Sequence, residues 1–263
     1  MKSSLAIVFA LLLLTISSPD ARAGELAKSQ ERFQYAVHYG PAAIGEVSLQ
    51  VGCPTTSYVA ALATAKSYGF AQQIYGFSMR LDSFIDPQSG QVLEGRTHIE
   101  EKGVPRNFRS RFSSEPSVAV TRTFRGIERH AAHALPMRGH DLLSWMLDMR
   151  RALVWTAGMS KHYIVWDGWK LMRIEARVAE RETVWTPHAI FEAYPVKIFR
   201  TRLFHQENQG FKAQSPKEEL GTAWFSADSA RLPVAMNYNA PIGQVRVLLT
   251  SVRRAQCTTS ASP

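Results

Sequence analysis

The chain has 263 residues, of which 45% are hydrophobic, 10% aromatic and 20% charged, and its formal net charge is +9. This composition is too apolar for a disordered chain, and two cysteines are too few for a disulfide-dense miniprotein or a multi-cysteine zinc site. The excess of positive charge fits nucleic acid, an anionic membrane surface or no particular partner.

Residues 1–23 are predicted to be a cleavable secretory signal peptide. Lys2 supplies a positive start, 5–16 is a nearly unbroken apolar run, and 21–23 (Ala-Arg-Ala) has small residues where signal peptidase cuts. The run is well short of the ~20 residues that span a bilayer, and no cysteine follows it, which excludes the lipoprotein form. We therefore expect a periplasmic protein with no transmembrane segment after cleavage, and no nucleic acid as its partner.

The mature chain is expected to contain one disulfide. Cys53 and Cys257 are its only cysteines, and an oxidising compartment outside the cytoplasm favours a bond between them. The loop closed by this bond is long, and loop entropy sets an upper bound of ~5 kcal/mol on its contribution to stability. Two free thiols, one of them catalytic, are the alternative, but neither cysteine has a histidine near it in sequence.

Alternating apolar and polar residues predict β-strands along most of the chain. Phe33 and Tyr35 share one face of the first strand, and the Gly-Pro pair at 40–41 turns the chain into a second strand with the same period. Further strands are predicted at 57–66, 78–85, 91–101, 106–113, 117–125, 161–167, 169–179, 182–192, 194–204, 220–227, 233–239 and 243–253. Short links such as Asp167-Gly168 favour hairpins and an antiparallel meander over parallel β-α-β units.

One clear helix is predicted, at 141–151. Asp141 can act as its N-cap, and Arg150 and Arg151 lie at the negative end of the helix dipole. The apolar face of the helix comprises Leu142, Trp145, Met146 and Met149. A helix with so wide an apolar face must lie on the sheet and cover its core.

Other segments lack a clear period. Residues 66–77 have helical spacing interrupted by glycines. The segment 130–140 is interpreted as a loop before the helix, and 205–219 as a long exposed loop. The small-residue tail 258–263 is expected to be disordered. Because no linker or repeat divides the chain, 24–257 is predicted to form one mainly β domain. Its curved antiparallel sheet, a half-barrel or open barrel, would be covered by the one helix.

Two segments resemble a known family. They are Asp141-Leu142-Leu143-Ser144 with Arg150 after it, and Trp224-Phe225-Ser226-Ala227-Asp228 with Arg231-Leu232-Pro233-Val234 after it. Behind a signal peptide and an opening Phe-x-Tyr strand, they resemble the bacterial envelope family catalogued as domain of unknown function 3108. The resemblance covers roughly residues 31–250. It implies a secreted or periplasmic β-rich protein, and it brings no established activity, cofactor or catalytic residue.

The motif residues are interpreted as structural. This set comprises Asp141, Ser144, Trp224, Asp228, Arg231 and Pro233. Asp228 can cap the backbone of the turn that follows it, and Pro233 suits the first position of a strand. Arg231 is placed to pair with Asp228 across the same turn.

No catalytic signature is found. Gly-x-Ser-x-Gly and Ser-x-x-Lys are both missing from the sequence. The acid pairs at 100–101 and 218–219 would point to opposite faces of a strand, so they are interpreted as solvated turn charges. His130, His133 and His140 lack the spacing of a metalloprotease helix, and we predict a solvated loop rather than a metal site. We expect no cofactor and no catalytic residue.

Arginines concentrate on three consecutive predicted strands between 96 and 129. In 106–112, Phe108 and Phe112 alternate with Arg109 and Arg111, which places aromatic side chains on one face and arginines on the other. This pattern predicts an arginine-lined face or rim for an anionic lipid or glycan, with a merely polar outer face as the alternative. The candidate ligand-binding residues are Arg96, Arg109, Arg111, Arg122, Trp145 and Arg150.

The leading hypothesis for the function is a non-enzymatic periplasmic protein that binds an amphiphile or another lipid-like envelope ligand. A curved sheet too large to fill with its own side chains would leave an apolar cavity. The same architecture with a filled core would suit an accessory of envelope assembly. A hydrolase acting on envelope glycan or lipid is the alternative. A polar cleft with converging titratable groups would support the hydrolase, and an apolar tunnel with an arginine rim would support binding.

Overall fold

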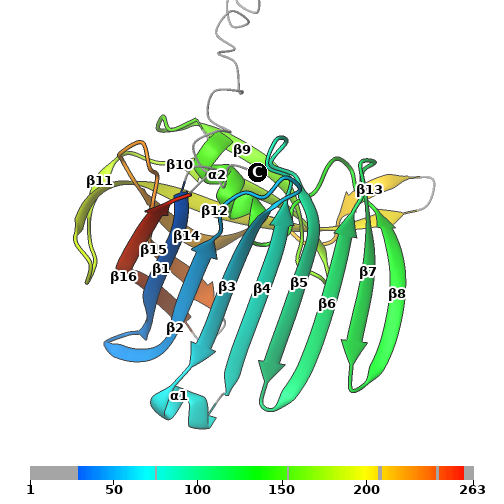
Figure 1. Cartoon of the computed structure of the whole chain (residues 1–263), viewed down its shortest axis with the longest axis horizontal. Coiled ribbons are helices and arrows are strands. Elements are labelled where there is room, and N and C mark those ends of the chain that lie inside the picture. The colour runs from blue at the N-terminus through cyan, green and yellow to red at the C-terminus, as the bar shows by residue number, and fades with distance from the viewer. Residues whose placement is uncertain (1–28, 75, 153, 207–208, 241–242, 258–263) are drawn as a thin grey trace, which may run out of the picture.

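The computed structural model describes residues 29–74, 76–152, 154–206, 209–240 and 243–257 (Figure 1). The predicted signal peptide at 1–23 and the tail at 258–263 lie outside the described residues. The strands are β1 (Ser29–Tyr39), β2 (Ala42–Val51), β3 (Val59–Ser67), β4 (Phe77–Ile85), β5 (Val92–Glu101), β6 (Val104–Phe112), β7 (Ser117–Phe124), β8 (Ile127–Ala134), β9 (Ser160–Trp166), β10 (Leu171–Val178), β11 (Glu182–Trp185), β12 (Ile190–Gln206), β13 (Gly210–Ala213), β14 (Glu218–Ser226), β15 (Pro233–Ala240) and β16 (Gly243–Gln256). The helices are α1 (Gly69–Ile74) and α2 (Ser144–Ala152).

All of these strands belong to one antiparallel sheet of 16 strands. Their order is β8-β7-β6-β5-β4-β3-β2-β1-β16-β15-β14-β12-β10-β9, with β11 and β13 paired to β12. The first strand is therefore the junction between two halves, one running from β2 to β8 and the other from β16 to β9. The predicted mainly β fold with a curved antiparallel sheet is confirmed.

The sheet curls until its two ends meet through side chains. Val118 and Val120 of β7 share a buried cluster with Ile164 and Trp166 of β9, at the opposite end of the strand order. The residue before α2, His140, also forms a parallel bridge to β9, where its N–H donates to the Ile164 carbonyl at 2.8 Å. This contact covers a strand edge that would otherwise be open.

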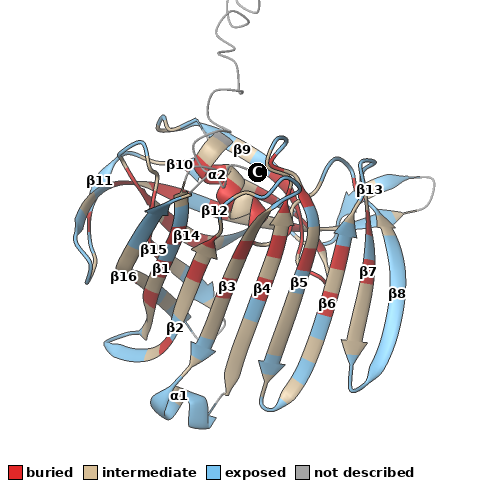
Figure 2. Ribbon diagram, viewed as in Figure 1, coloured by how far each residue is buried: buried red, intermediate tan, exposed pale blue. Residues whose placement is uncertain are grey.

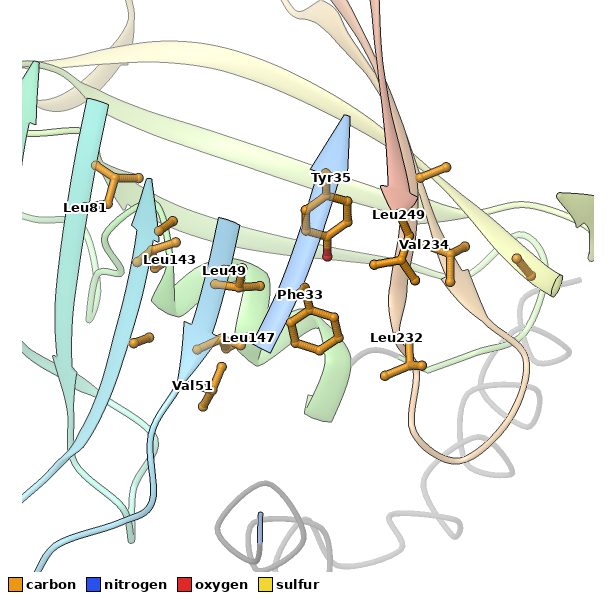
Figure 3. Close-up of a cluster of buried hydrophobic side chains, with 14 of the residues drawn as sticks. Phe33, Tyr35, Leu49, Val51, Leu81, Leu143, Leu147, Leu232, Val234 and Leu249 are labelled. Carbon is orange, nitrogen blue, oxygen red and sulfur yellow. The ribbon is translucent and has the colours of Figure 1, made fainter. Parts of the chain in front are cut away.

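Helix α2 packs against the inner face of the curled sheet, as its apolar face predicts. Leu143 and Leu147 lie in one cluster with Phe33 and Leu49 of the first two strands (Figure 3). Met149, on another side of the helix, lies in a second cluster with strands of the β9–β14 half. The helix thus joins the two halves of the sheet, and burial is densest around it (Figure 2).

The start of α2 is fixed by a buried cap. Asp141 accepts hydrogen bonds at Oδ1 from the N–H groups of Leu143 and Ser144, at 3.1 and 2.8 Å, and donates its own N–H to the Ser144 hydroxyl. The predicted N-cap role is confirmed, although regular helix begins at Ser144 rather than at 141. Gly95 of β5 makes room for this cap, because a Cβ there would lie 2.6 Å from Asp141 Oδ2.

Several predictions about the connecting segments were wrong. The predicted loop 130–140 begins inside strand β8, which is exposed on both faces and so shows no alternation of polarity. The predicted loop 205–219 contains the end of β12, all of β13 and the start of β14. The predicted strands 182–192 and 194–204 divide differently, because β12 runs without a break through Pro195. The ambiguous segment 66–77 contains the short helix α1.

Candidate functional site

Strand register defines which side chains share the inner face of the sheet. Leu81, Phe108 and Val120 are buried there, and residues two positions along the same strands point the same way. We call the inner-face residues at the α1 end of β4–β8 the open-end patch. The patch comprises Met79, Ile99, Val104, Arg106, Phe124, Ile127 and Arg129.

Five side chains of the patch lie in one row across five strands. Met79 pairs with Ile99, Ile99 with Arg106, Arg106 with Phe124, and Phe124 with Ile127. Directly opposite residues of antiparallel strands lie side by side on one face. The row is therefore an apolar strip that Arg106 interrupts in its middle.

The open-end patch is only partly covered. Red, buried positions concentrate in the half of β4–β7 that faces α2, and the other half of these strands is tan or blue (Figure 2). Met79, Ile99 and Val104 are half-buried, while Phe124 and Ile127 are exposed. Apolar side chains therefore remain accessible on the inner face of this part of the sheet.

The outer face of the same strands is polar and internally paired. His98 Nδ1 lies 2.6 Å from Asn107 Oδ1, and Thr121 Oγ1 lies 3.1 Å from His130 Nδ1. Arg80 donates two hydrogen bonds to Asp82. Pairs of this kind satisfy the polar groups of a solvated face, and the apolar strip therefore belongs to the inner face alone.

Three of the predicted ligand-binding arginines lie on this outer face. Arg96, Arg109 and Arg111 all donate to the carboxylate of Glu94, at 2.6, 2.8 and 3.1 Å. Burial raises the pKa of Glu94, but the three guanidinium hydrogen bonds outweigh it and hold that pKa at about 2. The predicted alternation of Phe108 with Arg109 is confirmed, and these three arginines are brought together around one carboxylate.

The arginines between 96 and 129 divide between both faces, so the predicted arginine-lined face contains only some of them. Arg106, Arg122 and Arg129 point inward, since Arg106 lies two residues from Phe108 and Arg122 two residues from Val120. Arg106 forms an ion pair with Glu101. Arg129 is exposed and makes no ion pair with any residue that the structure describes. In the sequence, Arg106 and Arg122 each lie two positions from an apolar residue of the same strand. This spacing is the signal that would have identified them as inward-pointing.

Arg122 of β7 contacts the opposite end of the sheet, at β9 and the turn between β9 and β10. We call this junction of the two sheet ends the seam. Its guanidinium lies 4.7 Å from the ring centroid of Trp169 and 5.7 Å from that of Trp166. It also donates hydrogen bonds to the carbonyls of Gly168 and Trp169, both at 3.2 Å. Burial lowers the pKa of Arg122. Cation–π contacts and carbonyl bonds across strands this distant in the order fit a structural clasp.

Trp145 and Arg150, the other two predicted ligand-binding residues, lie on α2 rather than in the patch. Trp145 packs against Tyr163 of β9, with ring centroids 6.1 Å apart. Arg150 is buried and pairs with Glu31 of β1 at 2.8 Å, and its remaining donors reach the carbonyls of Ala230 and Arg231 at 3.0 and 3.1 Å. The six predicted residues thus do not converge, and their role in ligand binding stays a prediction.

The space beside α2 is nearly filled by side chains. A recess next to Leu147 and Arg151 has a volume of about 30 Å³, and a second one beside Asp141 has about 10 Å³. One water molecule requires ~10–15 Å³ of such space. These two recesses therefore have room for one to a few waters, and neither admits an acyl chain.

The three clustered histidines do not form a common site. His130 lies on the outer face with Thr121, and its Nε2 is 3.0 Å from Glu128. His133 points inward and stacks on Trp166 with ring centroids 4.7 Å apart. Burial lowers the pKa of both His133 and His140. Within the described ranges no group of three or more His, Cys, Asp or Glu side chains is arranged to hold a metal ion.

The second motif segment builds a tight turn between β14 and β15. Asp228 Oδ1 accepts from the N–H of Ala230 at 3.1 Å and from the Ser226 hydroxyl at 2.6 Å. The Ser226 hydroxyl in turn accepts from the N–H of Leu232 at 2.7 Å. Asp228 therefore caps its own turn as expected, while Arg231 donates to the carbonyl of Ser226.

The other motif residues also have structural contacts. Trp224 donates its indole N–H to Glu182 at 2.6 Å. Pro233 opens β15, as expected. Cys53 and Cys257 form the predicted disulfide, which suits a compartment outside the cytoplasm.

One known family model matches most of the chain. The model of the family described as protein of unknown function (DUF3108) matches residues 34–250, so the chain belongs to this family. No curated protein matches the sequence significantly. In the parts of the chain that the structure describes, no helix has the length and apolar character to cross a membrane.

One solved structure shares the fold. It is the crystal structure of a β-barrel-like protein of domain of unknown function DUF1849 from Brucella abortus, with 10% identity and a TM-score of 0.56. The alignment covers 87% of this chain and 98% of that chain. At so low an identity the likeness concerns the fold alone.

Two further solved structures align with lower scores. A protein with a YmcC-like fold from Bacteroides fragilis NCTC 9343, designated an exported protein, has 9% identity and a TM-score of 0.31 over 86% of this chain and 95% of its own. A protein from Parabacteroides distasonis ATCC 8503, designated a lipoprotein, has 9% identity and a TM-score of 0.33 over 86% and 96%. TM-scores this low support no conclusion about this chain.

Proposed function

We propose that this protein is a non-enzymatic periplasmic binder of an amphiphile, which it holds against the open-end patch. The observation that carries the proposal is the contrast between the two faces of β4–β8. The outer face pairs its own polar groups, while the inner face presents accessible apolar side chains around an arginine. A single sheet layer with this polarity has its apolar side available to a ligand.

The charges of the patch favour an anionic head group. Arg106 lies in the middle of the apolar strip, and Arg129 lies two residues beyond Ile127 at its edge. Arg122 lies directly beside Arg129 on the inner face. Glu101 neutralises part of this charge through its pair with Arg106. Arginine binds phosphate and carboxylate through two parallel hydrogen bonds, so a phospholipid, a lipopolysaccharide phosphate or a fatty acid carboxylate would fit.

An apolar chain would lie along the strip formed by Met79, Ile99 and Phe124. The recesses beside α2 are too small for it, so the ligand would stay at the open end rather than enter the core. An accessory of envelope assembly would use the same surface for a lipid-modified client. The hydrolase alternative has no specific support in the side-chain geometry of the described residues.

The test compares arginines on the two faces of the same strands. R106S/R129S removes two inner-face guanidinium groups, and R109S/R111S removes two on the outer face as the matched control. Native mass spectrometry of the protein purified from periplasm would show a co-purifying amphiphile in the wild type and in R109S/R111S. R106S/R129S should lose it, and its affinity for cis-parinaric acid should fall about tenfold, the effect of one charge-assisted hydrogen bond.

Two results would contradict the proposal. One is a wild-type protein free of amphiphile that also shows no thermal shift with any envelope lipid. The other is loss of ligand in R109S/R111S with retention in R106S/R129S, which would assign binding to the outer face. Circular dichroism of both variants checks that the sheet is intact.

A further inference from the structure

Helix α1 exposes apolar side chains at the open end of the sheet. Phe70 is 76% exposed and Ile74 63% exposed, and they lie four residues apart, so both occupy one side of this short helix. The surrounding segment 67–79 contains no charged residue. No described residue of α1 is buried, so the helix contributes nothing to the core and presents its side chains to the surroundings.

The turn between β7 and β8 projects a second apolar tip at the same end (Figure 1). Ile127 is 61% exposed, and Phe124 on the opposite strand is exposed beside it. Arg125 lies between them with its guanidinium 5.2 Å from the Phe124 ring centroid. Arg129 follows two residues after Ile127 on the same face.

Between these two tips, Lys102 in the β5–β6 turn adds another positive charge. The acids near it are Glu100 and Glu101, the latter paired with Arg106. On α1's side, Lys66 is neutralised by Glu46 at 2.9 Å. The β7–β8 tip also carries Glu128, whose carboxylate lies 3.0 Å from His130 Nε2 on the outer face. Arg125 and Arg129 therefore outnumber the acid at this tip.

We propose that the open end of the sheet docks on an anionic bilayer surface, with Phe70, Ile74 and Ile127 inserted among the head groups. The tips of consecutive hairpins lie along one edge of the molecule, so a flat surface can touch α1 and the β7–β8 turn at once (Figure 1). Apolar residues on separate projecting tips, with Arg125 and Arg129 beside the β7–β8 tip, match the two attractions of a membrane interface.

This docking extends the proposed function, because it names the source of the ligand. Vesicle binding can nevertheless be tested separately from amphiphile binding. The open-end patch begins at the same edge, since Phe124 and Ile127 belong to both. In a docked molecule the edge of the patch would therefore adjoin the bilayer, which would be the source of the amphiphile.

The test is cosedimentation of the full mature protein with sucrose-loaded vesicles. Wild type should bind vesicles of phosphatidylethanolamine and phosphatidylglycerol, bind phosphatidylcholine vesicles more weakly, and lose affinity as salt screens the cations. F70S/I74S should bind about tenfold more weakly or worse, the order expected for withdrawing two large apolar side chains from an interface. R125S should reduce binding to the anionic vesicles only.

The matched control is W185S/I190S on the β11–β12 hairpin. These two residues pair across that hairpin and are 68% and 55% exposed, so the control removes similar apolar area from another part of the surface. It should bind vesicles like wild type. Equal binding by F70S/I74S and wild type overturns the docking, as does loss of binding in W185S/I190S alone.

The same preparations separate this inference from the proposed function. F70S/I74S should still bind cis-parinaric acid like wild type, because neither side chain belongs to the open-end patch. Vesicle binding without any amphiphile bound would leave the docking intact and overturn the ligand. Amphiphile binding with no vesicle binding would leave the proposed ligand intact and overturn the docking.

Discussion

The carboxylate of Glu94 binds three arginines of the outer face. Its side chain is 15% exposed, whereas those of Arg96, Arg109 and Arg111 are 52%, 42% and 62% exposed. The carboxylate is therefore enclosed while its partners remain in contact with water. Screening by that water reduces what each pair contributes, so the group acts as a network more than as a strong ion pair.

Replacing Glu94 with Gln should lower the free energy of unfolding at pH 7 by about 1 kcal/mol. The pKa of Glu94 in the folded protein is about 2, below its ordinary value of 4.5, so its contribution is present above pH 4.5 and is lost as the pH falls toward 2. The difference between wild type and E94Q in urea unfolding should shrink over that interval. Equal stability of the two proteins at pH 7 would contradict this account.

The arginines also show what could be predicted at the residue scale. The alternation of Phe108 with Arg109 correctly separated the two faces of β6, because a strand has a fixed period of two. The sequence could not indicate that Glu94 would take up three outer arginines, since that depends on the register of β5 against β6. The inner position of Arg122 follows from the same period applied to Val120.

At the scale of elements, α2 is held at both ends by buried polar contacts. Asp141 caps its start and accepts from the Ser83 hydroxyl of β4. Arg150 near its end pairs with Glu31, and the side chains of this pair are only 3% and 5% exposed. Burial raises the pKa of Asp141, and hydrogen bonds from Ser83, Ser144 and Leu143 oppose that rise. The helix is thus fixed to the β2–β8 half at one end and to the central strand at the other.

Arg150→Met should destabilise the protein by about 3 kcal/mol, because the buried carboxylate of Glu31 loses its main partner. Arg254, which lies 2.9 Å from Glu31, keeps part of the charge compensated. The double variant E31Q/R150M should recover part of the loss, since it removes the uncompensated charge as well. Chemical denaturation of the three proteins tests this, and a double variant less stable than R150M would contradict it.

Elements with one buried face were predictable, and the exceptions have physical causes. Strands β1, β4 and β7 alternate because one side packs on the core. Strand β8 carries exposed residues on both sides, and β13 pairs only with the end of β12, so neither has a periodic signal. The predicted boundary between strands 182–192 and 194–204 lies inside β12, which continues through Pro195 opposite Trp224.

At the scale of the whole molecule, the first strand is the place where the two halves of the sheet join. β1 pairs with β2 on one side and with β16 on the other, and Glu31 faces Val51 and Arg254 in those registers. Cys53 follows β2 and Cys257 follows β16, so their disulfide bridges the two neighbours of β1 across its start. Closure at the opposite ends of the sheet relies on the seam at Arg122, which no local sequence pattern could predict.

Removing the disulfide should therefore weaken the contact between the two halves of the sheet. It should also raise the conformational entropy of the unfolded chain. C53S/C257S should lose about 2–5 kcal/mol of unfolding free energy, the range for a bond that closes so long a loop, with the chain-entropy estimate as its upper bound. Hydrogen exchange should rise first in the amides at the start of β1 and in the paired residues of β16. Wild type in reducing agent should behave like the variant, and the variant should not respond to the reductant. Unchanged stability of C53S/C257S would mean that the pairing of β1 with its two neighbours and the Arg150–Glu31 contact hold the two halves together by themselves.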